Sequence, residues 1–595
     1  MMPRRKLYTL IIVALSFFSH AENVFASSDI SVIDSQCYDR VFSHVNLSEQ
    51  DIENYKKVFA LIKAEKISQA INLSKEISNN VLMGHVWAQI YLSKTYASKY
   101  QELKDWLKKY NDHPQANRIY KLALKKSKNR AELVNPAYRR SVNVSMPASS
   151  TPSYRWQDER FSGNKHVTYL RGQLAKFKTY IRKGHTKSAR KILEDNVFKQ
   201  RVPNRTFDSM SANLALLYFL DNQNELAIEW ALIAAERGDE PQALWIAGLT
   251  HWRLANYESA AEYFKKLAST SYINQRLSAK SAYWAYRAFM KLDKKKEARN
   301  WLKTASTNKR TFYGILANYK LGKKFEYNWT AVSYFNDFTK SDYVDELVQS
   351  SAMRRAIILL HLGENKLAEQ DIKNDHKNMT QAQLEVAMYM AQQYGMPALG
   401  IILSKCLAGN DPNMQYDHID YPVPDWEPKG GWKIDRAFAF ALVRQESAFH
   451  SEAQSWAGAK GLMQVMPATA AYISKDRNLR KKENKALFDA EYNLAMGQRY
   501  VNYLIDQPYI QGNMFFLAVA YNAGPGNLIK WERRMEYDED PLLFMESVPA
   551  AETRNYIERV MTNYWMYNMR LKNDNTSLEQ VARDEWPHLA DESEK

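Results

Sequence analysis

Glu446 is the residue whose type and placement in this sequence best suit acid chemistry. It stands near the end of a stretch with apolar residues at intervals of three and four, which predicts a largely buried helix with Asp435 as its N-cap. The carboxyl end of a helix carries partial negative charge, and this charge, like apolar surroundings, disfavours an ionised carboxylate. A glutamate in such a place keeps its proton near neutral pH, so the sequence predicts that Glu446 can act as a general acid.

The chain after Glu446 is expected to turn and then to enter a second helix. Gly458 and Gly461 permit a tight bend, and Pro467 suits the first turn of the following helix. Such a bend would fold residues 462–466 back over the helix end that carries Glu446. Taken alone, however, a glutamate near a helix end is more often a solvated surface residue, because ionisable side chains are mostly exposed.

Four short motifs in the last third of the chain favour a catalytic role for Glu446 over that of a solvated surface residue. They read RQES (444–447), GLMQVMP (461–467), AYNAGPG (520–526) and ETRNYI (552–557). In this order they resemble the soluble lytic transglycosylases of bacterial cell-wall metabolism, closely over about residues 432–571 and more loosely over most of the helical chain before them. In that family a single glutamate is the catalytic acid and base, and the motif match assigns this role to Glu446.

The resemblance also implies roles for eight other residues of the motifs and of the loop between them. Six are expected to contact substrate: Ser447, Ser455, Gln464, Met466, Tyr521 and Asn522. The Tyr521 hydroxyl is expected to bond Glu446 or the acetamido group of the substrate. Two residues are expected to support the site structurally: Glu552 and Arg554.

The number of carboxylates near the motifs bears on the mechanism. Most glycoside hydrolases use two carboxylates, whereas these motifs offer one, since Glu452 is expected to be a solvated loop residue. One acid suffices when the substrate supplies the nucleophile. The resemblance therefore implies cleavage of the β-1,4 bond between N-acetylmuramic acid (MurNAc) and N-acetylglucosamine (GlcNAc) in peptidoglycan, with formation of a 1,6-anhydro-muramyl end. Two alternatives stay open: a lysozyme-type muramidase, and a non-catalytic scaffold that recruits other cell-wall enzymes.

The N-terminal residues 1–26 have the pattern of a secretory signal peptide. Arg4, Arg5 and Lys6 precede an apolar run that is too short to span a bilayer comfortably, and Ala26 suits a cleavage site. No cysteine ends the apolar run, so a lipoprotein anchor is not expected. These features predict a periplasmic protein without a stable membrane anchor.

Composition narrows the classes of partner and cofactor. The formal net charge is +16, and removal of Arg4, Arg5, Lys6 and Glu22 with the signal peptide leaves +14. Such a surface attracts polyanions. For an exported protein, the carboxylates of peptidoglycan are a better match as the anionic partner than nucleic acid. The alternative is that the charge serves solubility alone. The sequence has neither an HExxH pattern nor a Cys/His cluster, so no metal or other cofactor is expected. Cys37 and Cys406 could form a disulfide.

The elements that must position these residues are predicted to be helices throughout. In the N-terminal part, helices are expected at 52–64, 67–77, 86–95, 99–109 and 115–125. Farther on, the helices recur in pairs: Ala260 and Phe264 in one pair are matched by Ala298 and Leu302 in the next. Stacked hairpins of this kind form an α-solenoid, and aromatic residues such as Trp245 and Trp284 are expected to pack its core.

The predicted fold is therefore all-α, an α-solenoid of helical hairpins followed by a lysozyme-like, mainly helical catalytic domain. In the resembling family the solenoid curls into a ring-shaped superhelix, and the same is expected here. A fragment beginning near Gly431 contains all four motifs and is expected to fold alone. The expected order is a signal peptide (1–26), an N-terminal helical region (27–140), a linker or loop (141–164), a solenoid (165–409), a connector (410–431), a catalytic domain (432–575) and a C-terminal tail (576–595).

Overall fold

The computed structural model describes residues 41–127, 132–136, 166–237, 240–330, 346–410, 415–481 and 484–589. Their regular secondary structure is helical, with isolated β-bridges in place of strands, which confirms the predicted all-α class. No helix within these ranges is both long enough and apolar enough to cross a membrane. The predicted signal peptide, the 141–164 linker, Cys37 and residues 590–595 of the tail lie outside the described residues.

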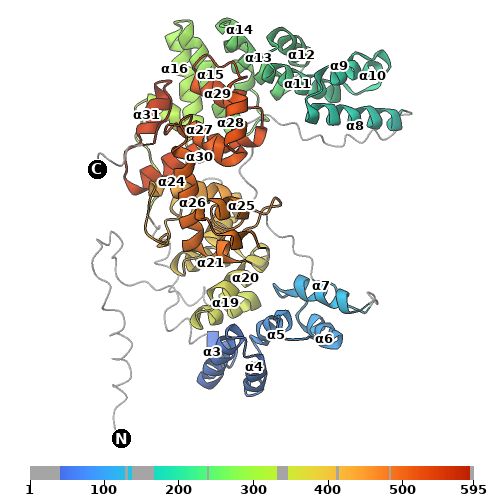
Figure 1. The fold of residues 1–595 in the computed structure, drawn as a ribbon, viewed down its shortest axis with the longest axis vertical. Helices are drawn as coiled ribbons and strands as arrows, with labels where there is room; N and C mark the ends of the chain where they lie inside the picture. Colours follow the sequence, from blue (N-terminus) through green and yellow to red (C-terminus); the bar gives the residue numbers. More distant parts are fainter. Residues whose placement is uncertain are drawn as a thin grey trace. The chain divides into compact units, whose positions relative to one another are not determined.

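The described residues gather into two compact units, each built from two separate stretches of the chain (Figure 1). The first unit combines the stretch before residue 139 with residues 333–390, and the second combines residues 139–332 with residues 391–595. The segment expected to form the solenoid, 165–409, thus contributes to both units.

The first unit is a set of short helices that pack in antiparallel pairs. Its five N-terminal helices lie within a few residues of the predicted positions. A buried ionic network joins its two stretches: His85 Nε2 lies 2.6 Å from Asp371 Oδ2, and Arg355 donates to Asp371 Oδ1. The helices are α3 (Glu49–Lys63), α4 (Ile67–Ser74), α5 (Met83–Leu92), α6 (Tyr100–Tyr110), α7 (Ala116–Lys126), α19 (Ser351–His361), α20 (Asn365–Asp375), the 3-10 helix η3 (His376–Asn378) and most of α21 (Gln381–Gln393).

The second unit begins with the helical hairpins predicted from the sequence. A Cβ atom added at Gly248 would lie 2.5 Å from the Phe264 ring, so the glycine allows α13 and α14 to approach closely. Trp245, Trp252 and Trp284 are buried, as expected for core residues. The hairpin helices are α8 (Val167–Lys183), α9 (Thr186–Glu194), α10 (Asn196–Arg201), α11 (Asn204–Leu220), α12 (Asn224–Arg237), α13 (Pro241–Arg253), α14 (Tyr257–Ala268), α15 (Gln275–Lys291), α16 (Lys295–Ser306) and α17 (Phe312–Lys320).

The C-terminal part of the second unit contains the four motifs. Its two longest helices, α26 and α30, are each partly covered by shorter ones, and α30 packs along α24. The elements are α22 (Pro397–Asn410), α23 (Asp417–Asp420), α24 (Arg436–Ser447), α25 (Pro467–Ser474), η4 (Arg477–Arg480), η5 (Ala486–Phe488), α26 (Ala490–Ile505), α27 (Met514–Ala523), α28 (Pro525–Glu532), α29 (Pro541–Ser547), α30 (Ala551–Leu571) and α31 (Thr576–Ala582).

The hairpin helices and the C-terminal helices share one hydrophobic core. Phe312 of α17 stacks on Trp565 of α30, with ring centroids 4.7 Å apart. Lys280 of α15 is buried, and its Nζ lies 2.7 Å from Glu546 and 3.5 Å from Glu558. The chain after Gly431 therefore shares its core with the hairpins, and from this we predict, contrary to the expectation above, that the fragment does not fold alone.

Candidate active site

Glu446 lies in the last turn of α24, as the sequence predicts. Asp435 caps the start of this helix by accepting a bond of 3.0 Å from the Phe438 N–H. The helix ends because Ala448 and Phe449 adopt left-handed backbone conformations, with φ of 47° and 67°. The Glu446 side chain, just before this abrupt end, is partly buried.

Burial raises the pKa of Glu446 from its ordinary value of 4.5 to about 7. The Tyr556 hydroxyl opposes this shift because it bonds the carboxylate, whereas the negative charge of Glu552 adds to it. A carboxyl group with a pKa near 7 is populated both as acid and as carboxylate at neutral pH. It can therefore donate a proton in one step and accept one in the next.

Tyr556 is the site residue that the sequence reasoning missed. Its hydroxyl donates to Glu446 Oε1 at 2.6 Å, and its ring is buried where α30 packs against α24. Tyr556 belongs to the ETRNYI motif and follows Glu552 by one helical turn. That spacing indicated a helix, but the signal for a partner of Glu446 is weak, because buried tyrosines at this interval usually serve packing.

Tyr521 does not bond Glu446, which was one of the two partners expected of its hydroxyl. Its hydroxyl donates to the Met463 carbonyl at 2.8 Å, so the hydroxyl that bonds Glu446 belongs to Tyr556. The Tyr521 ring stacks on the Tyr556 ring, with centroids 6.5 Å apart. Tyr521 thus joins the GLMQVMP segment to the tyrosine that holds Glu446.

The chain between Glu446 and α25 is held against α26 by Asn493, which is fully buried. Its amide donates to the carbonyls of Lys460 and Leu487 and accepts from the Met463 N–H. Gly461 has a φ of 78°, and a Cβ there would lie 2.1 Å from the Leu487 carbonyl oxygen. Only glycine fits this position, which explains the tight bend predicted at Gly461.

Ser455 and Gln464 are both engaged with this loop. The Ser455 hydroxyl accepts from the Ala459 N–H at 2.9 Å. The Gln464 amide nitrogen donates to the carbonyls of Ala453 and Gly461 at 3.1 and 2.8 Å. Within the described ranges the Ser455 hydroxyl proton and the Gln464 amide oxygen form no hydrogen bond, and the loop fixes both side chains in place.

The other residues of the predicted substrate set lie at helix ends in the motif segments. Ser447 donates to the Val443 carbonyl at 3.2 Å within α24. Met466 precedes α25 and is 38% exposed, which suits a wall residue. The Asn522 amide oxygen accepts from the Thr553 hydroxyl at 2.7 Å, so it ties α27 to α30.

Glu552 and Arg554 differ in their surroundings although both open α30. Arg554 is buried, and its guanidinium donates to the carbonyls of Val548 and Pro549 at 2.5 and 3.2 Å. It therefore holds the turn before α30. Glu552 is exposed and acts on the site through its charge, which raises the pKa of Glu446.

A cavity of about 1070 Å³ lies between α25, η4 and α26. Its basic side chains are Lys475, Arg477, Arg480 and Arg499. Tyr472 and Tyr503, which also line it, meet edge to face at 5.8 Å. A series of ring contacts connects this cavity to the site, from Tyr503 through Tyr500 to Tyr521. We call it the basic cavity; the sequence reasoning did not identify it.

Comparisons with known proteins agree with this geometry. Residues 427–543 match the family model of the Transglycosylase SLT domain. The soluble lytic murein transglycosylase of Escherichia coli K12 is 27% identical over 314 residues, which are 51% of this chain and 45% of that protein. The chain thus spans about half the length of the curated relatives it matches.

Two solved structures have the same fold over nearly the whole chain. The 70-kDa soluble lytic transglycosylase of Escherichia coli aligns with 91% of this chain and 100% of its own, at 17% identity and a TM-score of 0.51. An inactive glutamate-to-glutamine mutant of the lytic transglycosylase Slt from Pseudomonas aeruginosa aligns with 94% of this chain and 91% of its own, at 17% identity and a TM-score of 0.54. Residues 427–543 thus match an SLT domain, and by its motifs and its fold the chain is similar to the soluble lytic murein transglycosylases.

Proposed function

We propose that this protein is a lytic transglycosylase that cleaves the MurNAc–GlcNAc β-1,4 bond of peptidoglycan and leaves 1,6-anhydro-muramyl ends. The observation that carries the proposal is Glu446, a carboxyl group with a pKa near 7 that is held by Tyr556 inside the matched SLT domain. The relatives' names support murein as the substrate. The inactive glutamate-to-glutamine mutant of the Pseudomonas relative supports a glutamate as its central group.

The first step needs Glu446 as an acid. Tyr556 bonds Oε1, so Oε2 can carry the proton to the glycosidic oxygen. As the bond from C1 to that oxygen breaks, the muramyl N-acetyl oxygen bonds to C1 and GlcNAc leaves with the proton. Fixed polar groups of the loop, such as Ser455 and Gln464, would orient the acetamido group.

The second step needs Glu446 as a base. Its carboxylate takes the proton of the muramyl 6-hydroxyl, O6 bonds to C1, and the acetamido oxygen is released. The acid is thereby regenerated and no water is consumed. Glu552 is exposed, and its charge raises the pKa of Glu446, so we assign it an electrostatic role.

We infer that the glycan strand extends from Glu446 toward the basic cavity. The cations there suit the carboxylates of peptidoglycan, and Tyr472, which is 65% exposed, offers a ring face for a sugar. The predicted signal peptide supports a periplasmic location, where this substrate lies. Recruitment of other cell-wall enzymes remains a separate proposal.

Product analysis tests the proposed reaction. Purified sacculi digested by the full-length protein are expected to yield muropeptides with anhydro ends, each lighter by one water than a hydrolysis product. Mass spectrometry of the digest distinguishes anhydro ends from the reducing ends that hydrolysis leaves. Reducing muramyl ends would instead identify a lysozyme-type muramidase, and intact sacculi would favour the scaffold.

Tyr556→Phe is expected to shift the alkaline limb of the pH–activity profile to higher pH and to lower turnover at its optimum by roughly tenfold. The hydroxyl bond favours the ionised carboxylate, so its loss raises the pKa of Glu446 above about 7. The acid form then persists to higher pH, but the carboxyl group is less well oriented. The measurement is kcat/KM on soluble glycan fragments between pH 5 and 9.

Tyr521→Phe is the matched control for this prediction. It removes a buried hydroxyl whose bond goes to the Met463 carbonyl, so the pH profile should keep its alkaline limb. If both variants shift the limb equally, or if neither does, Tyr556 does not set the ionisation of Glu446.

A further inference from the structure

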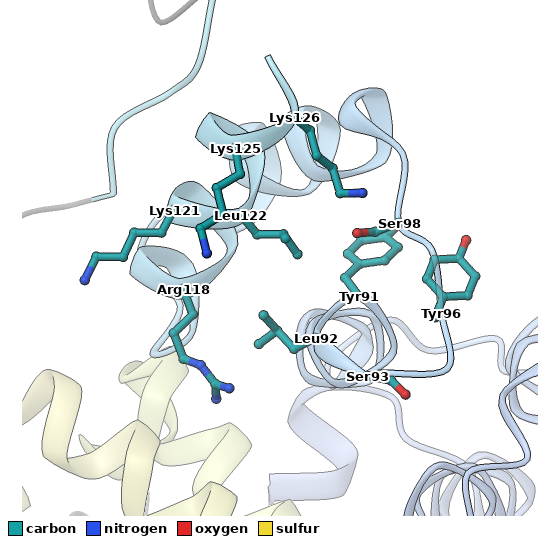
Figure 2. Close-up of a pocket in the computed structure, with 10 residues that line it drawn as sticks. All are labelled: Tyr91, Leu92, Ser93, Tyr96, Ser98, Arg118, Lys121, Leu122, Lys125 and Lys126. Atoms are coloured by element: carbon teal, nitrogen blue, oxygen red, sulfur yellow. The ribbon is translucent and has the colours of Figure 1, made fainter. Parts of the chain in front are cut away.

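A second basic pocket, of about 360 Å³, lies in the first unit between the end of α5, the loop that follows it, and α7 (Figure 2). Figure 2 shows its basic side chains on one side, all from α7, and Tyr91 and Tyr96 on the other. Ser98, which is 4% exposed, closes the tyrosine side. We call it the α7 pocket.

The number of positive charges on this face of α7 exceeds what the stability of the helix explains. Arg118, Lys121 and Lys125 follow one another at intervals of three and four, so they share a face of α7 and repel one another. Lys125 and Lys126 lie in the last turn, where the helix dipole favours cations, but this does not explain Arg118 and Lys121. A bound anion would relieve the repulsion along the whole face.

No carboxylate among the described residues neutralises this wall. The ten residues that line the pocket include no acid, and none of its four cations forms an ion pair within the described ranges. By contrast, Lys63 and Lys104 of the same unit form ion pairs, with Glu364 at 2.6 Å and with Glu132 at 2.7 Å. The acid nearest in sequence to the tyrosine wall, Glu102, already accepts bonds from the Tyr96 hydroxyl and the Lys99 N–H.

The opposite wall suits a sugar rather than a bare anion. Tyr91 and Tyr96 present rings whose centroids are 6.0 Å apart, and Leu92 and Leu122 add apolar surface. The hydroxyls of Ser93 and Ser98 supply hydrogen-bonding groups. A volume of about 360 Å³ is at the small end of ligand pockets, large enough for one substituted sugar ring.

The geometry points to a non-catalytic site in the α7 pocket for a carboxylate-bearing sugar, with the carboxylate on the α7 cations and the ring against the tyrosines. As a component of peptidoglycan, the muramyl residue with its lactyl carboxylate fits this description, and this identification rests on the proposed function. The site would hold the polymer independently of cleavage.

Lysine footprinting of the full-length protein tests the site directly. Limited acetylation followed by mass spectrometry reports the reactivity of each lysine with and without N-acetylmuramic acid at constant ionic strength. Lys121 and Lys125 are expected to lose at least about half of their reactivity on binding, whereas Lys75 and Lys108, exposed in the same unit, should not change. GlcNAc, which lacks the carboxylate, should protect less.

Two outcomes of the footprint would overturn the proposal. One is equal protection by inorganic phosphate, which would make the pocket a general anion site without sugar recognition. The other is equal change at Lys75 and Lys108, which would indicate non-specific binding. Because N-acetylmuramic acid has no glycosidic bond to cleave, the footprint is independent of whether the protein acts on peptidoglycan.

A charge-matched pair of variants tests whether the pocket holds the polymer. In a Glu446→Gln background, Lys121→Glu/Lys125→Glu is expected to weaken binding to purified sacculi by roughly tenfold, while Lys75→Glu/Lys108→Glu, with the same net charge, stays within about twofold. Circular dichroism checks that both variants are folded. Equal binding by the two variants would overturn the proposal.

Cleavage assays separate this inference from the proposed function. With Glu446 intact, Lys121→Glu/Lys125→Glu should cleave short soluble fragments at the unaltered rate. A protein that cleaves peptidoglycan but shows no lysine protection would contradict only the α7 pocket. A protein that shows protection without cleavage would contradict only the proposed function.

Discussion

Glu446→Gln is expected to lower the turnover of peptidoglycan by at least about two to four orders of magnitude while leaving the fold intact. The amide is nearly isosteric with the carboxyl group and can still accept the bond from Tyr556. It can neither donate a proton to the leaving oxygen nor take one from the muramyl 6-hydroxyl. Both steps of the proposed reaction are therefore lost together, and release of soluble muropeptides from sacculi measures the loss.

The same variant is expected to be more stable than the unaltered protein at alkaline pH. Because the pKa of Glu446 is raised from 4.5 to about 7 in the folded state, its ionisation opposes folding. The contribution of the protonated Glu446 to the free energy of unfolding is complete below about pH 4.5 and is lost as the pH rises through about 7. Glu446→Gln cannot ionise, so above pH 7 it should gain up to about 3 kcal/mol in unfolding free energy.

Two controls sharpen this prediction. Glu452→Gln changes an exposed loop carboxylate and should leave turnover unchanged. Glu552→Gln removes the charge that raises the pKa of Glu446, so that pKa should fall while substantial turnover remains. A loss in Glu552→Gln as large as in Glu446→Gln would instead indicate a mechanism with two catalytic carboxylates.

Lys280→Met is expected to destabilise the second unit by about 3–5 kcal/mol, because removing one partner of a buried ion pair leaves the other charge uncompensated. Lys280 is 1% exposed, and the two carboxylates that it faces, Glu546 and Glu558, are 2% and 1% exposed. Glu558 keeps a second cation, Arg276 Nη1 at 3.5 Å, so the carboxylate that loses its ion-pair partner is Glu546. The Tyr313 hydroxyl donates to Glu546 at 3.1 Å but does not neutralise its charge. Calorimetry of the full-length protein should show a lower unfolding temperature for the transition of this unit.

Lys265→Met provides the matched control. Lys265 pairs with Glu262 at 2.8 Å on the same set of hairpins, but both side chains are exposed. Surface pairs of this kind contribute about 0–1 kcal/mol, so the unfolding temperature should hardly change. If both substitutions lowered the unfolding temperature equally, the burial of Lys280 would add nothing to the stability of the unit.

The same contacts predict the behaviour of a fragment that begins at Gly431. It would lack Lys280, and it would also lack Arg287, whose guanidinium lies 2.9 Å from Asp540. It would further expose Trp565 by removing Phe312. We therefore expect the fragment to be unfolded or aggregated, whereas a fragment that begins near residue 166 retains these contacts and should fold.

The sequence alone determined the helices and the position of the acid. Helices form through local bonds and caps, so Asp435 at the start of α24 and the glycines of the loop could be read from their spacing. The pairing of Ala260 and Phe264 with Ala298 and Leu302 likewise predicted hairpins, because each hairpin must bury one face. The direction of the Glu446 pKa shift was predicted from its place at the end of an apolar helix, although burial in the folded protein is its largest cause.

Only the tertiary structure decided which distant residues meet. Tyr556 reaches Glu446 across 110 residues of sequence, and the spacing within either helix does not specify that their faces pack together. The expected bond from Tyr521 to Glu446 does not form for the same reason, since the Tyr521 hydroxyl donates to the Met463 carbonyl. The other expected partner of Tyr521, the acetamido group of the substrate, stays a prediction. The ion pairs of Lys280 with Glu546 and Glu558 were also not visible in the sequence. A buried charge is tolerated only where folding brings its partner, and that partner lies in another part of the chain.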